Sequence, residues 1–143
     1  MSRSWPPGEF PRLRKSNHTV RSDYDPSYNC LSWAAGETSR RWDPTPGYYW
    51  PPSAPRQRTK EAIIKAFETV GYSPCVDAKL EKEFEKIAIY ARENGTCTHA
   101  ARQLPSGKWT SKLGDCEDIE HTSLECLNGP AYGMPVAYLK REI

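Results

Sequence analysis

The stretch KIAIYARENGTCTHAARQLPSGKWTSKL, residues 86–113, carries the clearest strand pattern in the chain and decides the fold class. Ile87 and Ile89 alternate with Ala88 and Tyr90, which is the two-residue period of a β-strand. Within the stretch, Asn94-Gly95 and Ser106-Gly107 are dipeptides that favour tight turns between antiparallel strands. We therefore predict a β-meander whose strands begin at Lys86, run from Cys97 to Leu104, and return from Trp109 to Leu113.

Helical patterns and one further strand flank this meander. One helix is predicted from Cys30 to about Ser39, and a second follows Thr59 as N-cap to about Val70, with Gly71 ending it. A short helical turn over 123–127 and a strand over 135–140 complete the order. The expected fold class is α+β, with N-terminal helices packed on a small antiparallel sheet.

The chain of 143 residues is long enough for one domain. Residues 1–27 are rich in Pro, Arg and Ser without apolar periodicity, so we expect an N-terminal arm before a single domain over 28–143. A proline-rich loop over 40–58 carries four aromatic rings, at Trp42, Tyr48, Tyr49 and Trp50. The loop is expected either to cover a groove or to plug a thin core.

Composition limits the classes of partner. The net charge of +2 gives no reason to expect nucleic acid as the main partner. No apolar run is long enough to span a membrane and the start has no signal-peptide core, so we expect a cytoplasmic protein with no membrane partner. Five cysteines at irregular spacing fit reduced thiols better than a disulfide framework.

Cys30 is the first candidate for chemistry. It follows Asn29 at a predicted helix start, where the helix dipole and free N–H groups stabilise a thiolate. A small buried residue at a capped helix start would give the same pattern. His99 is the candidate base, on a strand whose alternation places Cys97, His99, Ala101 and Gln103 on one face. If the Cys30 helix packs on that face, thiol and imidazole can act together.

A catalytic histidine needs a polar partner that orients its ring. A two-residue turn at Ser106-Gly107 would place Gly114 opposite His99, whereas a three-residue turn would place Asp115 there. Three further candidates for this partner lie within residues 117–121, and they are Glu117, Asp118 and His121. The structural alternative for each is a place in a solvated turn that leads into the cap of the next helix.

The motif YNC at residues 28–30 before an apolar helix, and a later histidine that starts a strand of an antiparallel meander, resemble the papain-like superfamily in its small bacterial form, the NlpC-type cysteine peptidases and amidases. The chain also resembles an uncharacterised bacterial family of about this length, over residues 23–141. The motifs that carry this second resemblance are NCLSWA at 29–34, THAARQL at 98–104, GKWTSKLG at 107–114 and DIEH at 118–121. The NlpC resemblance implies a papain-like fold, Cys30 as nucleophile, His99 as base, and His121 or else Asp118 as orienter. The sequence departs from the NlpC pattern at Asn29, where that family usually has Asp.

Other side chains are candidates for binding a substrate. Trp33 would lie beside the thiol, Trp50 belongs to the loop that could cover a groove, and Trp109 could form a groove floor. Lys112 could neutralise an anionic substrate group. Ordinary core packing for the tryptophans and solvation for the lysine are the structural alternatives.

A zinc site is the alternative to a catalytic site for several of these side chains. Its soft ligands would come from five residues, Cys97, His99, Cys116, His121 and Cys126, of which the last three are regularly spaced. The chain has no Cys-x2-Cys knuckle, and we expect neither a metal nor another cofactor.

These patterns lead to two expectations of function. The first is a thiol hydrolase or acyl transferase acting on an amide-type bond of a peptide, protein or other amide-bearing substrate, through a thioester on Cys30. The second is a non-catalytic binding or interaction protein with a degenerate papain-like fold, such as a defence- or phage-associated partner, in which Cys30 is inert. The reactivity of the Cys30 thiol separates the two.

Overall fold

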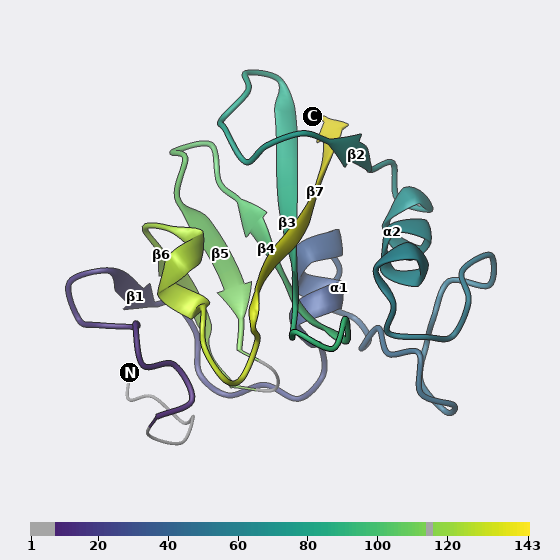
Figure 1. Cartoon of the computed structure of the whole chain (residues 1–143), viewed down its shortest axis with the longest axis horizontal. Helices are drawn as coiled ribbons and strands as arrows, with labels where there is room; N and C mark the ends of the chain where they lie inside the picture. Colours follow the sequence, from purple (N-terminus) through teal and green to yellow (C-terminus); the bar gives the residue numbers. More distant parts are fainter. Residues whose placement is uncertain (1–7, 114–115) are drawn as a thin grey trace.

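The computed structural model describes residues 8–113 and 116–143 and contains one seven-stranded antiparallel sheet (Figure 1). The strands are ordered β1-β6-β5-β4-β3-β7-β2 across the sheet. Their bounds are β1 His18–Val20, β2 Ser73–Cys75, β3 Phe84–Ala91, β4 Cys97–Gln103, β5 Trp109–Lys112, β6 Asp118–His121 and β7 Met134–Glu142. The helices are α1 Cys30–Ala35, α2 Lys60–Glu68 and the 3₁₀ turn η1 Leu124–Leu127.

The predicted fold class was wrong in its balance of helix and sheet. We expected N-terminal helices packed on a small sheet of papain-like type, but the dominant element is the seven-stranded sheet, with only two short α-helices in the described residues. The six-residue α1 ends where Gly36 adopts a φ of 86°, well before Ser39. Two three-residue strands, β1 and β2, extend the predicted meander at its edges.

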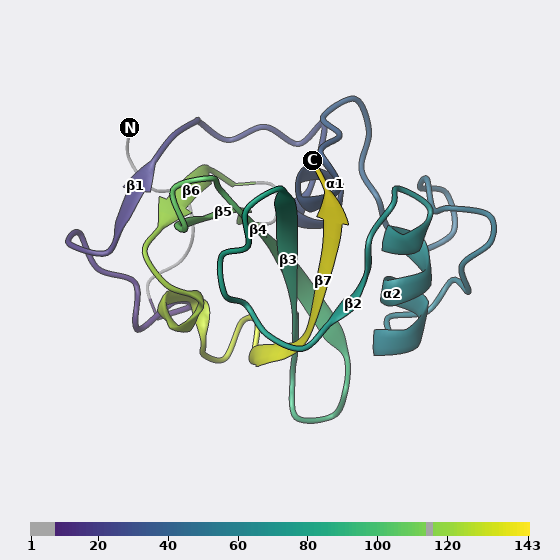
Figure 2. The same cartoon turned by 90° about the horizontal axis from the view of Figure 1, so that it is seen from above.

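The sheet separates two hydrophobic cores. α1, α2 and the aromatic loop cover the first face of the sheet, called here the helix face. The side chains of Ile87 and Ile89 lie on this face. η1 and the segment around Phe10 and Tyr132 cover the second, called here the η1 face, which receives Ala88 and Tyr90. Figure 2 shows α1 and η1 on opposite sides of the sheet. Any two side chains on adjacent positions of a central strand are therefore directed into different cores.

Local sequence explains how both helices start. Asn29 accepts a hydrogen bond from the Ser32 N–H, and Ser32 Oγ accepts one from the Asn29 N–H, which forms a capping box. Thr59 caps α2 through the Ala62 N–H, so that N-cap prediction is confirmed. Neither helix of the described residues is long and apolar enough to cross a membrane.

The aromatic loop packs down onto the core. Trp42 and Trp50 are both buried, and the Trp42 ring lies 5.9 Å from that of Phe67 in α2. The N-terminal arm also joins the fold, because His18–Val20 pairs with Ile119–His121 at the edge of the sheet. These contacts thicken a core that two short helices alone would leave thin.

The meander contains one irregularity that matters for the site. The β3–β4 register steps from Tyr90–His99 to Ala91–Cys97, so Thr98 is the extra residue of a β-bulge. As a result, Cys97 points into the helix-face core while His99 faces Tyr90 and Tyr132 on the η1 face. The predicted common face for Cys97 and His99 was therefore wrong.

Candidate functional site

Cys30 is the first helical residue of α1 and is buried against β4. Its Sγ lies 3.8 Å from the carbonyl oxygen of Thr98, which accepts the weak S–H hydrogen bond. Burial raises the pKa of the Cys30 thiol to about 11. The thiol is consequently protonated at neutral pH, and the six-residue helix does not offset the cost of burying a thiolate.

His99 belongs to a hydrogen-bonded relay on the opposite face. Its Nε2 lies 2.9 Å from Ser111 Oγ, which in turn lies 2.8 Å from Nε2 of His121. His121 Nδ1 completes the relay at 2.8 Å from the carbonyl oxygen of Ser123. The structure thus brings His99 and His121 together, as the sequence suggested, but through Ser111, which the sequence analysis missed.

The two proposed dyad members are not brought together. Ala100, next to His99, packs in the same core as Cys30, so the His99 ring points away from α1. The backbone of β4 therefore lies between the thiol and the imidazole. In this arrangement His99 cannot take a proton directly from Cys30.

Asp118 also lies apart from His99. It pairs with Lys112 across β5 and β6, and its Oδ2 accepts a hydrogen bond of 2.6 Å from the hydroxyl of Tyr28. Lys112 is fully buried, with Nζ 4.5 Å from the centre of the Tyr28 ring and donating to the Cys116 carbonyl. Trp33 packs on the same tyrosine, with ring centres 5.5 Å apart. These four side chains form a closed cluster that anchors the segment before α1.

The register at Ser106-Gly107 differs from both predicted alternatives. Gln103 pairs with Trp109 and Arg102 with Thr110, and continuing this register would place Leu113 opposite His99. Gly114 and Asp115, the two predicted residues opposite His99, lie outside the described residues. The orienter that the structure supplies is instead the Ser111 hydroxyl.

The remaining candidates for substrate binding are core residues. Trp50 is 3 % exposed and donates its indole N–H to the Pro55 carbonyl, and Trp109 is 4 % exposed in the η1-face core. Neither ring lies among the residues that line the open groove described below. No group of three or more His, Cys, Asp or Glu residues within 8–113 and 116–143 is placed to hold a metal ion.

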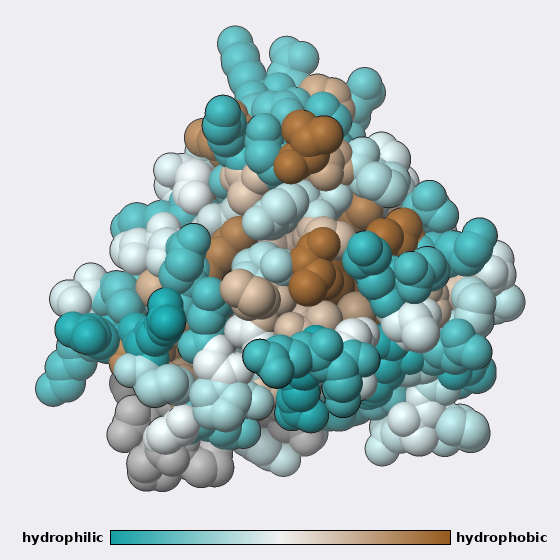
Figure 3. Space-filling view, viewed as in Figure 1, coloured by the Kyte–Doolittle hydropathy of each residue, from teal (hydrophilic) through white to brown (hydrophobic). Residues whose placement is uncertain are grey.

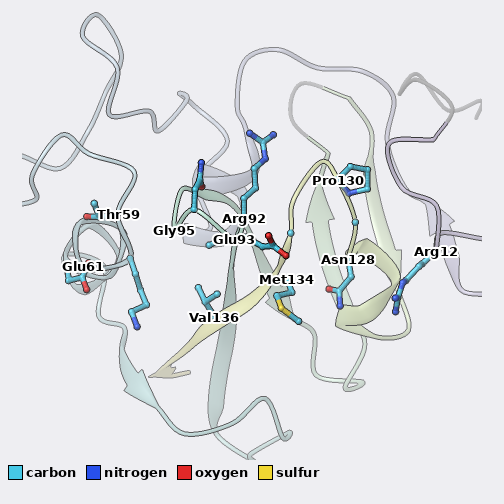
Figure 4. A pocket seen from close by; sticks show the side chains of 15 residues that line it. Arg12, Thr59, Glu61, Arg92, Glu93, Gly95, Asn128, Pro130, Met134 and Val136 are labelled. Carbon is cyan, nitrogen blue, oxygen red and sulfur yellow. The ribbon is translucent and has the colours of Figure 1, made fainter.

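An open groove lies elsewhere, beside the start of β7 (Figure 4). This groove of about 1120 Å³ is bordered by the start of α2, the β3–β4 turn, and the loop that precedes β7. Met134 and Val136 project from β7 into it and are 58 % and 42 % exposed. One signal in the sequence could have indicated this groove. Pro135 between two apolar residues is typical of a strand edge that has no neighbouring strand.

Comparisons with known proteins identify a family but no activity. The model of one family, described as a domain of unknown function (DUF7689), matches residues 19–140. No curated protein and no solved structure matches the chain. The matched region contains every strand of the sheet apart from the first residue of β1 and the last two of β7.

Proposed function

This chain belongs to the DUF7689 family, and we propose that it is a non-catalytic interaction module that binds an extended peptide segment of a partner protein in the groove beside β7. The observation that carries the proposal is the open groove along a strand edge with exposed apolar side chains. Recognition by such an edge uses the backbone and side chains of the strand together.

The first half of β7 has a free edge on one side. β2 pairs with β7 only at Tyr138, Leu139 and Lys140, so residues 134–137 have no strand partner on that side within the described residues. Pro135 supplies no N–H, so any backbone N–H that donates to a ligand must belong to one of its neighbours. Exposed Met134 and Val136 then provide the apolar contact area that makes binding favourable. Figure 3 shows apolar side chains exposed over β3 and β7 and surrounded by hydrophilic ones.

The shape of the groove favours a single extended chain as the occupant. Thr59 and Glu61 at the start of α2 border one side, and Asn128 and Pro130 border the other (Figure 4). Walls on both sides of β7 suit a single polypeptide strand better than the edge of a second folded domain. The rim is mixed in charge and suits a polar border around an apolar centre; its charged side chains are Arg12, Lys60, Arg92, Glu61 and Glu93.

The surroundings of Cys30 support binding in preference to hydrolysis. A protonated thiol that donates to the Thr98 carbonyl is a poor nucleophile, and the groove beside β7 does not include Cys30 among its lining residues. The proposal therefore corresponds to the second expectation from the sequence, without the papain-like fold.

The proposal is tested by selecting peptides that bind the full chain. A random library of about 12 residues displayed on phage is panned against the immobilised protein, and enriched peptides are measured by fluorescence anisotropy. We expect micromolar binders, and Val136→Asp should weaken them by about tenfold or more because a charge replaces an apolar contact.

Val76→Asp is the matched control, because Val76 is 94 % exposed and lies outside the groove. It should leave affinity unchanged within about twofold. The proposal fails if no peptide is enriched, or if enriched peptides bind Val136→Asp and the unmodified protein equally well.

A further inference from the structure

The buried histidine relay has a single consistent arrangement of protons. A carbonyl oxygen can only accept, so His121 Nδ1 carries a proton toward Ser123. His121 Nε2 is then unprotonated and accepts from the Ser111 hydroxyl, whose oxygen accepts from Nε2 of His99. The lone pair of the relay is left on His99 Nδ1, a buried atom with no hydrogen-bond partner in the described structure.

The environment of His99 is aromatic and almost free of charge. Tyr90 of β3 lies edge-on with ring centres 5.3 Å apart, and Tyr132 stacks on the imidazole at 4.1 Å and 7°. Ser111 of β5 contacts Nε2 of His99, and His121 of β6 lies beyond Ser111. The nearby His18 of β1 helps to lower the pKa of His121. Burial, and next the repulsion that a protonated His121 would exert, keep the pKa of His99 well below its ordinary value.

Tyr132 links this relay to the groove. It lies in a loop closed by two backbone hydrogen bonds between Gly129 and Gly133, of 3.1 and 2.8 Å. Its carbonyl accepts a hydrogen bond from Thr98 Oγ1, and the loop residues on either side of it line the groove. Gly133 lies so close to β3 that an added Cβ would be 2.0 Å from the Ala91 oxygen. If Tyr132 moves together with its loop, residues that line the groove must move with it.

We propose that the relay is an acid-sensitive latch on the 129–134 loop: protonation of His99 at Nδ1 releases Tyr132 and weakens peptide binding in the groove. This inference rests on the proposed function for its second half. The added proton creates an N–H without an acceptor and a positive charge among rings. Stacking of an imidazolium on Tyr132 offsets less than the cost of burying that charge, so exposure to water by loop opening is favoured.

Hydrogen–deuterium exchange of the full chain, corrected for the intrinsic pH dependence of exchange, measures the latch without any ligand. Between about pH 7.5 and about pH 5, residues 129–134 should lose protection, while 87–89 of β3 should stay protected. The His99→Gln variant keeps a side-chain donor for Ser111 and cannot be protonated, so its loop protection should not change with pH.

The same pH series applied to a selected peptide measures the coupling. Affinity for the unmodified protein should fall by about tenfold over this range, and that for His99→Gln should change by less than about twofold. If His99→Gln does not fold, the His99 ring resonance of the unmodified protein decides instead, because it must titrate over the range in which the loop opens.

Two outcomes overturn the inference. Loop protection that is independent of pH in the unmodified protein removes the latch, and so does opening that persists in folded His99→Gln. If no peptide binds at any pH, the proposed function fails while exchange of the loop still decides whether the latch exists.

Discussion

Cys30 and His99 lie on opposite faces of the same sheet, although Cys30 Sγ is only 3.8 Å from the carbonyl oxygen of Thr98, the residue next to His99. The β4 backbone that brings them close along the chain also separates their side chains. Cys30 is consequently packed as a small buried residue, and His99 is directed to a relay with Ser111 and His121.

The first prediction concerns the reactivity of Cys30. Because burial raises the pKa of its thiol to about 11, we expect iodoacetamide to label Cys30 more slowly than the half-buried Cys75 at every pH from about 7 to about 9. His99→Ala should leave the apparent pKa of Cys30 unchanged. Peptide mapping of the alkylated protein gives both rates. An apparent pKa below about 8.5 that depends on His99 would contradict the structure and restore the thiol-hydrolase hypothesis.

The sequence predicts those strands and turns whose signals lie in neighbouring residues. The meander was predicted because alternation around Ile87 and the turn at Asn94-Gly95 are encoded in neighbouring residues. β1 and β2 were missed because three-residue strands have no period of their own and form only through distant partners. His18 pairs with His121, and Ser73 pairs with Lys140. Such pairings depend on the completed sheet.

The candidate site was predicted in its parts and not in its arrangement. The Asn29 cap places Cys30 at a helix start, as expected from the sequence. The β-bulge at Thr98 moves Cys97 to the opposite face from His99, and one extra residue is enough because strand faces alternate every residue. No local sequence pattern indicates this bulge.

The second prediction is that stability falls as the pH falls below about 6.5. Burial lowers the pKa of His121 to about 4 and that of His99 well below its ordinary value, so the unfolded chain binds these protons first. The free energy of unfolding should be unaffected by them at higher pH and then decrease by about 1.4 kcal/mol per pH unit for each histidine. The contribution of His99 should end where the 129–134 loop opens, because the folded chain then binds that proton as well. Urea unfolding at about pH 7.5, 6 and 5 measures this slope.

The double variant His99→Gln, His121→Gln is the control for this slope, since neither amide titrates. Its stability at about pH 7.5 should be lower, but its dependence on pH over this range should be flatter. Equal stability of the unmodified protein at about pH 7.5 and about pH 5 would mean that both histidines are accessible to water already at about pH 7.5.

The third prediction compares the two helix caps. The Asn29 side chain accepts hydrogen bonds from Ser32 N–H and Trp42 N–H and donates one to the Trp42 carbonyl. Asn29→Ala therefore removes the helix cap and leaves these buried backbone groups without their hydrogen-bond partner. We expect a loss of about 2–4 kcal/mol in the free energy of unfolding. Thr59→Ala removes one cap bond, to Ala62 N–H, and should cost about 1 kcal/mol. Equal losses in chemical denaturation would show that the bonds between Asn29 and Trp42 contribute nothing.

The fourth prediction uses two glycines that share a left-handed backbone but differ in their surroundings. Gly133 has a φ of 77° and Gly95 a φ of 87°, so alanine costs conformational energy of about 1–2 kcal/mol at either position. At Gly95 nothing lies within 4 Å of the added Cβ, whereas at Gly133 it would lie 2.0 Å from the Ala91 oxygen.

Gly133→Ala must therefore separate the 129–133 loop from β3, and we expect it to lose at least about 3 kcal/mol of stability and to open the groove wall. Thermal or urea unfolding of both variants gives the comparison, and the peptide selected against the unmodified protein reports on the groove. Gly95 also borders the groove, but it lies in the β3–β4 turn, where an added Cβ displaces nothing. Gly95→Ala should therefore bind the selected peptide as tightly as the unmodified protein does. If the two variants lose the same stability, the close packing of the loop against β3 does not hold the groove wall in place.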